Sequence, residues 1–249
     1  MISLFRKIRQ SLLQQNRVTR YIAYALGEIF LVTIGILIAL QVNTWNENRK
    51  YQNKEAGILK DLHREFLLNK ESVHTAIQHH QTILEAINNI LNEMGEPDPE
   101  LSEAQMDSLL YLTLDYENYS PSQTVIAELI SSGNTTLITS DTLRTLIFQW
   151  VNEIEDKNEG YQSLDAIGEN LMIPYISKNG SMKNIDSYGM LKANGRSKFT
   201  SRNLGLLQQV EFENQLDNQA WGITNFLIKL KKLEEIIEAI VFHTQPITP

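Results

Sequence analysis

The sequence predicts an all-α protein in which an N-terminal transmembrane helix continues into an elongated antiparallel helical bundle. Three observations support this fold class. A long apolar run occupies residues 21–45, apolar residues recur every three or four positions afterwards, and no alternation typical of strands occurs. We therefore divide the chain into a basic segment (1–20), a transmembrane helix (21–45) and an extramembrane helical-bundle domain (46–249).

The apolar run is long enough to cross a bilayer. Residues 21–42 contain a single charge, Glu28. At about 1.5 Å per residue, a helix of this length spans roughly 33 Å, against a hydrocarbon core of about 30 Å. The Leu, Ile, Val and Phe side chains of residues 29–40 together favour insertion by about 3 to 5 kcal/mol. The expected interface anchors are Tyr21, Tyr24 and Trp45.

The distribution of charge predicts the orientation. The net charge is −8, yet residues 1–20 carry five basic residues and no acid. Four basic residues follow the span closely: Arg49, Lys50, Lys54 and Lys60. The positive-inside rule thus favours a cytoplasmic N-terminus and a periplasmic domain in a bacterial inner membrane. The acidic remainder of the chain disfavours a nucleic-acid partner.

Two alternatives concern the N-terminus. A cleaved signal peptide would need a shorter apolar run and an A-x-A site, which Ala39-Leu40-Gln41 does not match, so we expect an uncleaved signal anchor. Residues 1–20 place apolar side chains at helical spacing among basic ones. They form either an amphipathic helix in the membrane interface or a solvated basic tail.

Two features of the span are candidates for helix packing. Ala23, Gly27, Gly35 and Ala39 lie at four-residue spacings and would let a second helix approach closely as a dimer seam. Glu28 is an ionisable group within the span, and such groups are often functional. It lies near the expected cytoplasmic end, so a structural role facing the headgroups is the favoured interpretation. Pairing with Arg17 or Arg20 of a neighbouring copy is the other.

The rest of the chain predicts helices separated by short breaks. The membrane helix continues with a stripe from Leu59 to Met94 and stops at the GEPDPE break. Further helices are expected over 103–115, from Ser120 to Gly133, from Thr139 or Ser140 to Pro174, and over 205–243. Ser102 with Gln105 forms a capping box, and Ser120 is the expected N-cap of the following helix. Residues 177–203 lack periodicity and are expected to form a loop.

The stripes of the two later long helices are expected to be buried. In the helix after Ser140 the stripe runs through Trp150 and Ile154 to Leu171. In the last helix it runs from Val210 through Trp221 to Val241. All these stripes must cover one another.

Candidate chemistry is sparse. The chain has no cysteine, which excludes disulfides, thiolate metal sites and thiol nucleophiles. Glu71 and His74 form one E-x-x-H motif, but a di-iron bundle needs two such motifs, so a solvated face is favoured. Phosphate-binding glycine loops and nucleophile-elbow motifs are absent from the sequence. The sequence therefore predicts no catalytic residue, cofactor or metal.

Two loops allow a functional interpretation beside a structural one. The loop from Ser131 to Ser140 is either a tight corner between helices or a surface for a ligand or partner. Residues 177–203 carry six basic side chains against Asp186 alone. They form a solvated loop, contact an anionic lipid, glycan or acidic partner, or dock on the acidic body of the same chain.

Several motifs carry a family resemblance: FRKIRQSLL, YALGEI, GILIALQVNTWNENRK and YSPSQ…ELISSGN…LITSDTLR. On these motifs the chain resembles an uncharacterised bacterial family of single-pass inner-membrane proteins, catalogued as a domain of unknown function. The resemblance covers the first 50 residues and residues 116–150, and the C-terminal helix only in pattern. The resemblance implies localisation in the membrane and an all-helical domain, and it supplies no catalytic residue.

The sequence thus favours a membrane-anchored helical interaction or scaffold protein without catalytic activity. Its expected partners are the lipid bilayer and either a second copy or another membrane protein. The alternative is a sensor-like periplasmic ligand-binding bundle that signals through a partner. An enzyme would require a pocket with convergent polar groups inside the bundle.

Overall fold

The computed structural model describes residues 17–199 and 202–245 and confirms the all-α fold class. The described residues form helices and contain no strand. In chain order the elements are α2 (Arg17–Leu91), α3 (Glu103–Leu114), α4 (Thr124–Ser131), η1 (Asn134–Leu137), α5 (Asp141–Ile167), η2 (Gly168–Met172), α6 (Ile173–Asn179), α7 (Met182–Asp186), η3 (Lys192–Asn194), η4 (Asn203–Gln208) and α8 (Val210–His243). The chain divides into two units between Ala56 and Gly57, inside α2.

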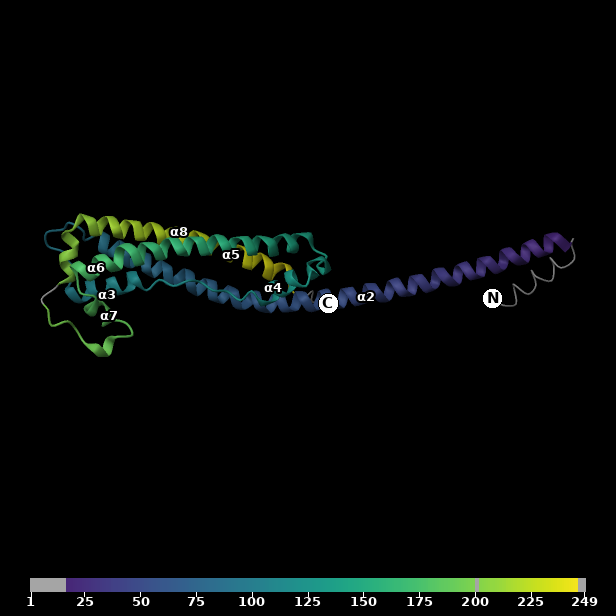
Figure 1. Ribbon diagram of the computed structural model, residues 1–249, viewed down its shortest axis with the longest axis horizontal. Coiled ribbons are helices and arrows are strands. Elements are labelled where there is room, and N and C mark those ends of the chain that lie inside the picture. Colours follow the sequence, from purple (N-terminus) through teal and green to yellow (C-terminus); the bar gives the residue numbers. More distant parts are fainter. Residues whose placement is uncertain (1–16, 200–201, 246–249) are drawn as a thin grey trace. The chain divides into compact units, whose positions relative to one another are not determined.

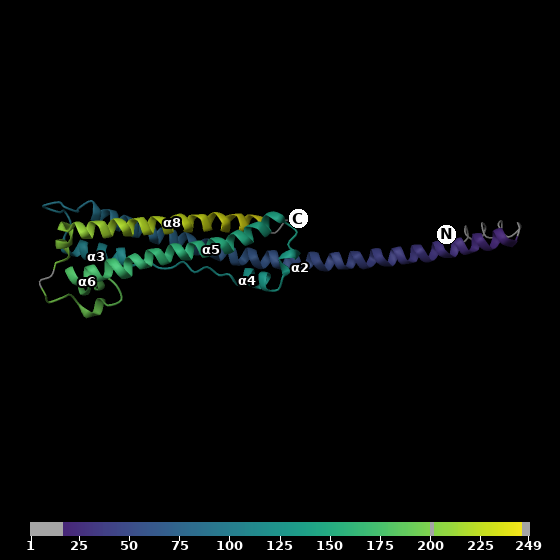
Figure 2. The same ribbon diagram turned by 45° about the horizontal axis from the view of Figure 1, so that its top comes forward.

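The second unit is built on three long helices: α2 from Gly57 onward, α5 and α8. The contacts Lys70–Glu238 (2.8 Å) and His74–Glu234 (3.5 Å) join α2 to α8, and the ion pairs Asp156–Lys229 (2.7 Å) and Glu153–Lys232 (2.5 Å) join α5 to α8. In both sets the residue numbers rise on one helix as they fall on the other, so α8 is antiparallel to α2 and to α5. Figures 1 and 2 both show α5 and α8 side by side, with α3, α6 and α7 at the end where α8 begins.

On each of these helices one series of buried positions follows alternating four- and three-residue steps, and further buried residues such as Glu65, Ile77 and Leu227 lie beside it. In α2 the series runs Leu62, Phe66, Asn69, Val73, Ala76, His80, Ile83, Ile87 and Ile90. In α5 it runs Leu143, Ile147, Trp150, Ile154, Lys157, half-buried Tyr161 and Leu164. In α8 it runs Phe212, Leu216, Gln219, Ile223, Phe226, Leu230, Leu233, Ile237 and Ile240, and the C-cap Thr244 continues it. This heptad spacing keeps one face of each helix against its neighbours.

Several predicted helix ends are confirmed. They could be predicted because each depends on residues within one turn of the chain. Ser102 accepts the amide hydrogen of Gln105, and the Gln105 side chain accepts that of Ser102, which completes the capping box. Ser140 caps α5 by accepting the amide hydrogen of Leu143. Gly133 follows α4 with φ of 69°, a left-handed conformation that favours glycine.

The predicted end of the third long helix at Pro174 is wrong. α5 passes into one π-helical turn, η2, and Pro174 lies in the first turn of the next helix, α6. Proline is tolerated there because the first helical turn needs no amide donor. Gly168 begins η2, and a Cβ on it would lie 1.8 Å from the Tyr116 hydroxyl oxygen. The tyrosine therefore requires glycine at this position.

Other predicted boundaries and burials also need correction. Residues 177–203 are not one loop, because they include the end of α6, α7 and η3. The last helix begins at Val210 and not at 205, because residues 203–208 form η4 and the extended residue Gln209 separates η4 from α8. Three residues assigned to buried stripes are exposed: Leu171, Val210 and Trp221. Val210 and Trp221 fall outside the heptad positions of α8, whereas Leu171 follows the series of α5 but lies in the π-helical turn η2, where Met172 is buried instead. The predicted start of α4 near Ser120 is also wrong, because the helix begins at Thr124, where a side chain from α2 caps it.

Candidate functional site

The apolar part of α2 in the first unit has exposed side chains. Leu31 and Leu37 expose 63% and 58% of their surface, and no residue of the most apolar window is buried. By length and composition this helix can cross a membrane. Nothing within the described chain covers this apolar surface.

The residues predicted for helix packing lie on this uncovered stretch. Apart from the adjoining residues and backbone of its own helix, no described atom lies within 4 Å of a Cβ added to Gly27 or Gly35. Ala39 and Glu28 are exposed, and Ala23 is half-buried. The four-residue seam is thus open to a second helix, and its use as a dimer contact stays a prediction.

The predicted interface anchors are exposed as well. Tyr21 and Trp45 expose 77% and 64% of their surface, and Tyr24 exposes 57%. The Arg49 guanidinium carbon lies 6.0 Å from the centre of the Trp45 ring, one turn further along the helix. A cation beside an aromatic ring is typical of residues at a bilayer surface.

A second candidate site begins with an extended segment, residues 115–123, which runs antiparallel along α2 within the second unit. The Asn69 side chain forms hydrogen bonds with the backbone of this segment, as a neighbouring strand would. Its amide donates to the Ser122 carbonyl at 2.9 Å and accepts the Ser122 amide hydrogen at 2.9 Å. The Tyr119 hydroxyl donates to the Asn69 carbonyl at 3.2 Å. A buried polar residue of the heptad series thus fixes the segment in register.

Glu65 determines where α4 begins. Its carboxylate is 7% exposed and accepts the amide hydrogens of Thr124 and Val125 at 2.6 and 2.8 Å. It also accepts the Ser122 hydroxyl at 2.6 Å. A carboxylate at a helix N-terminus accepts hydrogen bonds from amides that lack partners within the helix, and its negative charge interacts favourably with the helix dipole. Because the cap comes from α2, α4 starts at Thr124 and not near Ser120.

Lys157 holds the other side of the extended segment. Its ammonium donates to the Tyr119 carbonyl at 2.6 Å, to Asn118 Oδ1 at 2.9 Å and to Asn158 Oδ1 at 2.7 Å. The residue is 2% exposed and its acceptors are all neutral. Burial lowers the pKa of this ammonium to about 8. The segment is therefore clamped between α2 and α5.

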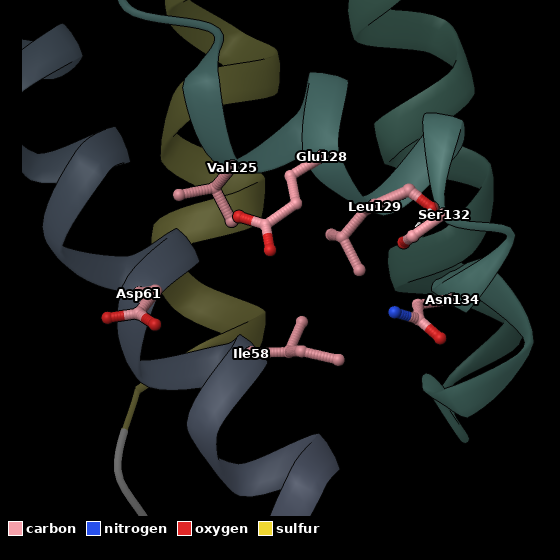
Figure 3. Close-up of a pocket in the computed structure, with 7 residues that line it drawn as sticks. All are labelled: Ile58, Asp61, Val125, Glu128, Leu129, Ser132 and Asn134. Carbon is pink, nitrogen blue, oxygen red and sulfur yellow. Dashed lines mark hydrogen bonds between the residues drawn. The ribbon is translucent and has the colours of Figure 1, made fainter.

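A small hollow adjoins Val125, whose amide donates to Glu65 (Figure 3). α2 contributes Ile58 and Asp61, and the other lining residues are Val125, Glu128, Leu129, Ser132 and Asn134. In Figure 3 the Glu128 carboxylate points toward the space above Ile58, with Asp61 on one side and Asn134 on the other. The hollow has a volume of about 100 Å³, which suits a few waters, whereas ligand sites are typically about 300 to 1,000 Å³.

The histidines have structural contacts. His74 of the E-x-x-H motif lies 3.5 Å from a Glu234 oxygen and 3.0 Å from the Gln78 amide nitrogen. His79 bonds the Asp115 carbonyl, and the fully buried His80 bonds the Ala76 carbonyl. Burial lowers the pKa of His80, since it penalises the charged imidazolium. Within residues 17–199 and 202–245, no group of three or more His, Asp or Glu side chains could hold a metal.

Sequence reasoning missed Glu65, Asn69 and Lys157, although the pattern offered a signal for two of them. Asn69 and Lys157 occupy heptad positions between apolar residues, where a polar side chain must find partners once buried. Glu65 carried no such signal, because it lies outside the heptad positions and its partners lie more than fifty residues away in the sequence.

Comparisons with protein-family models, curated proteins and solved structures give no match to this chain.

Proposed function

We propose that this protein is a scaffold anchored in the bacterial inner membrane by one helix, with its short N-terminus cytoplasmic and its bundle periplasmic. One observation carries the proposal. The first part of α2 exposes apolar side chains over its whole circumference, while the heptad faces of α2, α5 and α8 are buried by each other. A helix that is apolar all round needs an apolar phase outside its own chain.

The surface of the bundle supports an interaction role. Trp221, Ile228 and Phe242 expose 61%, 62% and 68% of their surface. They are spaced by multiples of seven residues, so they lie on one face of α8. Trp and Phe are enriched in protein interfaces, and Trp is among the residues that contribute most to their binding energy. The proposal assigns the protein a partner, either a second copy or another membrane protein, and no catalytic activity.

Crosslinking in native membranes followed by mass spectrometry tests the proposal. We expect one defined partner, or the protein itself, to be captured by the full chain. The W221S/I228S variant should lose this capture, while the exposed control T224S on the same helix should retain it. Recovery of an uncrosslinked monomer alone from the wild-type membranes would contradict the scaffold role.

The orientation has a separate test that uses the absence of cysteine from the chain. A K60C variant provides a single thiol at an exposed position in the second unit. A membrane-impermeant maleimide should label it in intact spheroplasts. Labelling only after lysis would place the bundle in the cytoplasm.

A further inference from the structure

The segment from Ser187 to Phe199, here called the basic loop, stands away from the bundle after α7 (Figures 1 and 2). Its large apolar side chains point into solvent. Met190 is 101% exposed, Phe199 is 87% exposed and Leu191 is 52% exposed. Such exposure is unfavourable in water, and a group of exposed apolar residues marks a site of contact.

Basic residues neighbour these apolar residues, since Lys192 follows Leu191 and Lys198 precedes Phe199 in the sequence. Lys192 and Lys198 lie within the basic loop and Lys183 lies on α7, and all three are exposed. None of the three forms an ion pair with another residue in the described ranges. The protein as a whole carries a net charge of −8, so this region opposes the overall charge.

Arg196 behaves differently and fixes the loop to the bundle. Its guanidinium pairs with Asp107 of α3, which is fully buried. The second Asp107 oxygen accepts the Asn203 amide at 2.6 Å. Of the alternatives considered for residues 177–203, docking on an acidic residue of the same chain is thus observed for Arg196. The remaining cations stay available for another partner.

Further contacts hold the ends of the loop in place. The Tyr188 hydroxyl donates to the Ala104 carbonyl at 2.8 Å, and the Ser197 amide donates to Asn184 Oδ1 at 2.9 Å. A Cβ added to Gly189 would lie 2.4 Å from the Tyr111 ring, so the backbone packs closely on α3 there. Met190 and Leu191 lie between these anchors, and the Phe199 amide donates to Ser197 Oγ at 3.2 Å, so all three apolar residues adjoin anchored positions.

A hollow of about 420 Å³ opens at the base of the loop. It is lined by Lys183, Asp186, Leu191 and Asn194. The lysine ammonium and the asparagine amide can donate hydrogen bonds to a phosphate, and Leu191 provides an adjoining apolar wall. Asp186 contributes the one carboxylate of the lining.

We propose that the basic loop binds the surface of a lipid bilayer that contains anionic phospholipid. Met190, Leu191 and Phe199 insert at the boundary between headgroups and acyl chains, while Lys183, Lys192 and Lys198 contact lipid phosphates. Apolar residues beside cations are the pattern of interfacial membrane binding. A soluble polyanion would engage the lysines and leave Met190 and Phe199 in water, so the apolar residues favour the bilayer.

Vesicle flotation with the full-length protein tests this proposal. The protein is held in nanodiscs of phosphatidylcholine and mixed with vesicles of either phosphatidylcholine alone or equal parts phosphatidylcholine and phosphatidylglycerol. We expect flotation with the anionic vesicles only. The K192E/K198E variant and the M190S/F199S variant should each bind these vesicles about tenfold more weakly or worse.

Matched controls separate the loop from general effects. K60E/K231E makes the same change of charge at exposed lysines of α2 and α8, and F242S removes an exposed aromatic ring from α8. Both should bind as the wild type does. All variants keep the apolar helix, so exchange of that helix between bilayers is common to every sample and does not depend on the loop.

Three results would overturn the proposal. The first is equal binding to vesicles with and without phosphatidylglycerol. The second is no binding to either kind of vesicle. The third is binding that M190S/F199S leaves unchanged and that soluble polyphosphate competes away, which would assign the loop to a polyanion.

Discussion

Two parts of the chain are rich in Leu, Ile and Val, but they place these residues differently around the helix. In α8 the fully buried apolar side chains follow the heptad series from Phe212 to Ile240, and the outer face carries exposed Lys231, Glu235 and Glu238 beside a few exposed apolar residues. In residues 29–40 the exposed apolar side chains surround the helix. A one-sided stripe can be covered by two neighbouring helices of the same chain. A helix with apolar side chains all round requires an apolar environment that its own chain does not provide.

The largest expected effect comes from charging the uncovered stretch. The L31R/L37R variant adds two arginines near the centre of the span, at a cost of about 5 to 7 kcal/mol, which exceeds the insertion energy of about 3 to 5 kcal/mol. The protein should leave the membrane pellet on alkaline carbonate extraction. The E28Q variant, which removes the natural charge, should remain in the pellet. Retention of L31R/L37R would show that this helix is not held by lipid.

A truncation in the buried series should destabilise the bundle strongly. Phe66 is fully buried, and its ring centre lies 5.0 Å from that of Trp150. We expect F66A to lower the free energy of unfolding by about 3 to 5 kcal/mol. The neighbouring L68A, at a 62% exposed position, should cost about 0.5 kcal/mol or less. Denaturant unfolding followed by tryptophan fluorescence measures both, and equal losses would contradict the heptad assignment.

Loss of the Glu65 cap should have an intermediate effect. E65A leaves the amides of Thr124 and Val125 without their acceptor, at a cost of about 1 to 3 kcal/mol. Hydrogen exchange at these two amides should accelerate. E71A, at an exposed position on the same helix, is the control and should leave both amides protected. Unchanged exchange in E65A would mean that α4 does not depend on α2.

The pH dependence of stability provides the smallest predicted effect. The pKa of Lys157 is lowered from 10.5 to about 8 in the folded protein, so between these values the unfolded chain binds more protons than the folded chain. Stability should therefore rise by about 1 to 2 kcal/mol between about pH 7.5 and pH 9.5 through this residue. Burial raises the pKa of Tyr119 to about 12, outside this interval.

The K157M variant tests this assignment because methionine keeps the length of the side chain and does not titrate. Its free energy of unfolding should change less with pH over the same interval than that of the wild type. K231M changes an exposed lysine and should retain the wild-type dependence. A pH dependence shared by all three proteins would assign the effect to other groups.

Local signals in the sequence were sufficient where a helix end depends on residues within a few positions. Ser102, Gly133 and Ser140 are examples, because a cap needs only the next turn of the chain. The start of α4 could not be predicted this way. Its N-terminal amides are satisfied by Glu65, which tertiary folding brings from another helix.

The stripes were predicted in outline, with errors in phase. Apolar residues occur at both Ile83 and Leu84 and at both Ile90 and Leu91, and only the heptad series separates the buried residue from the half-buried one in each pair. Polar residues within the series, such as Asn69 and Lys157, interrupted the apolar count although they are buried. Their partners lie on the extended segment, which has no periodic pattern of its own.

The proposed membrane anchor requires lipid around residues 29–40, and spin-label accessibility in bilayers measures whether this claim holds. Because the chain has no cysteine, single labels at Ile36, Leu37 and Ile38 sample three sides of the helix in reconstituted bilayers. We predict that oxygen reaches all three labels and that a polar nickel chelate reaches none of them. Access of the nickel chelate to these labels, or exclusion of both reagents at every position, would contradict the claim.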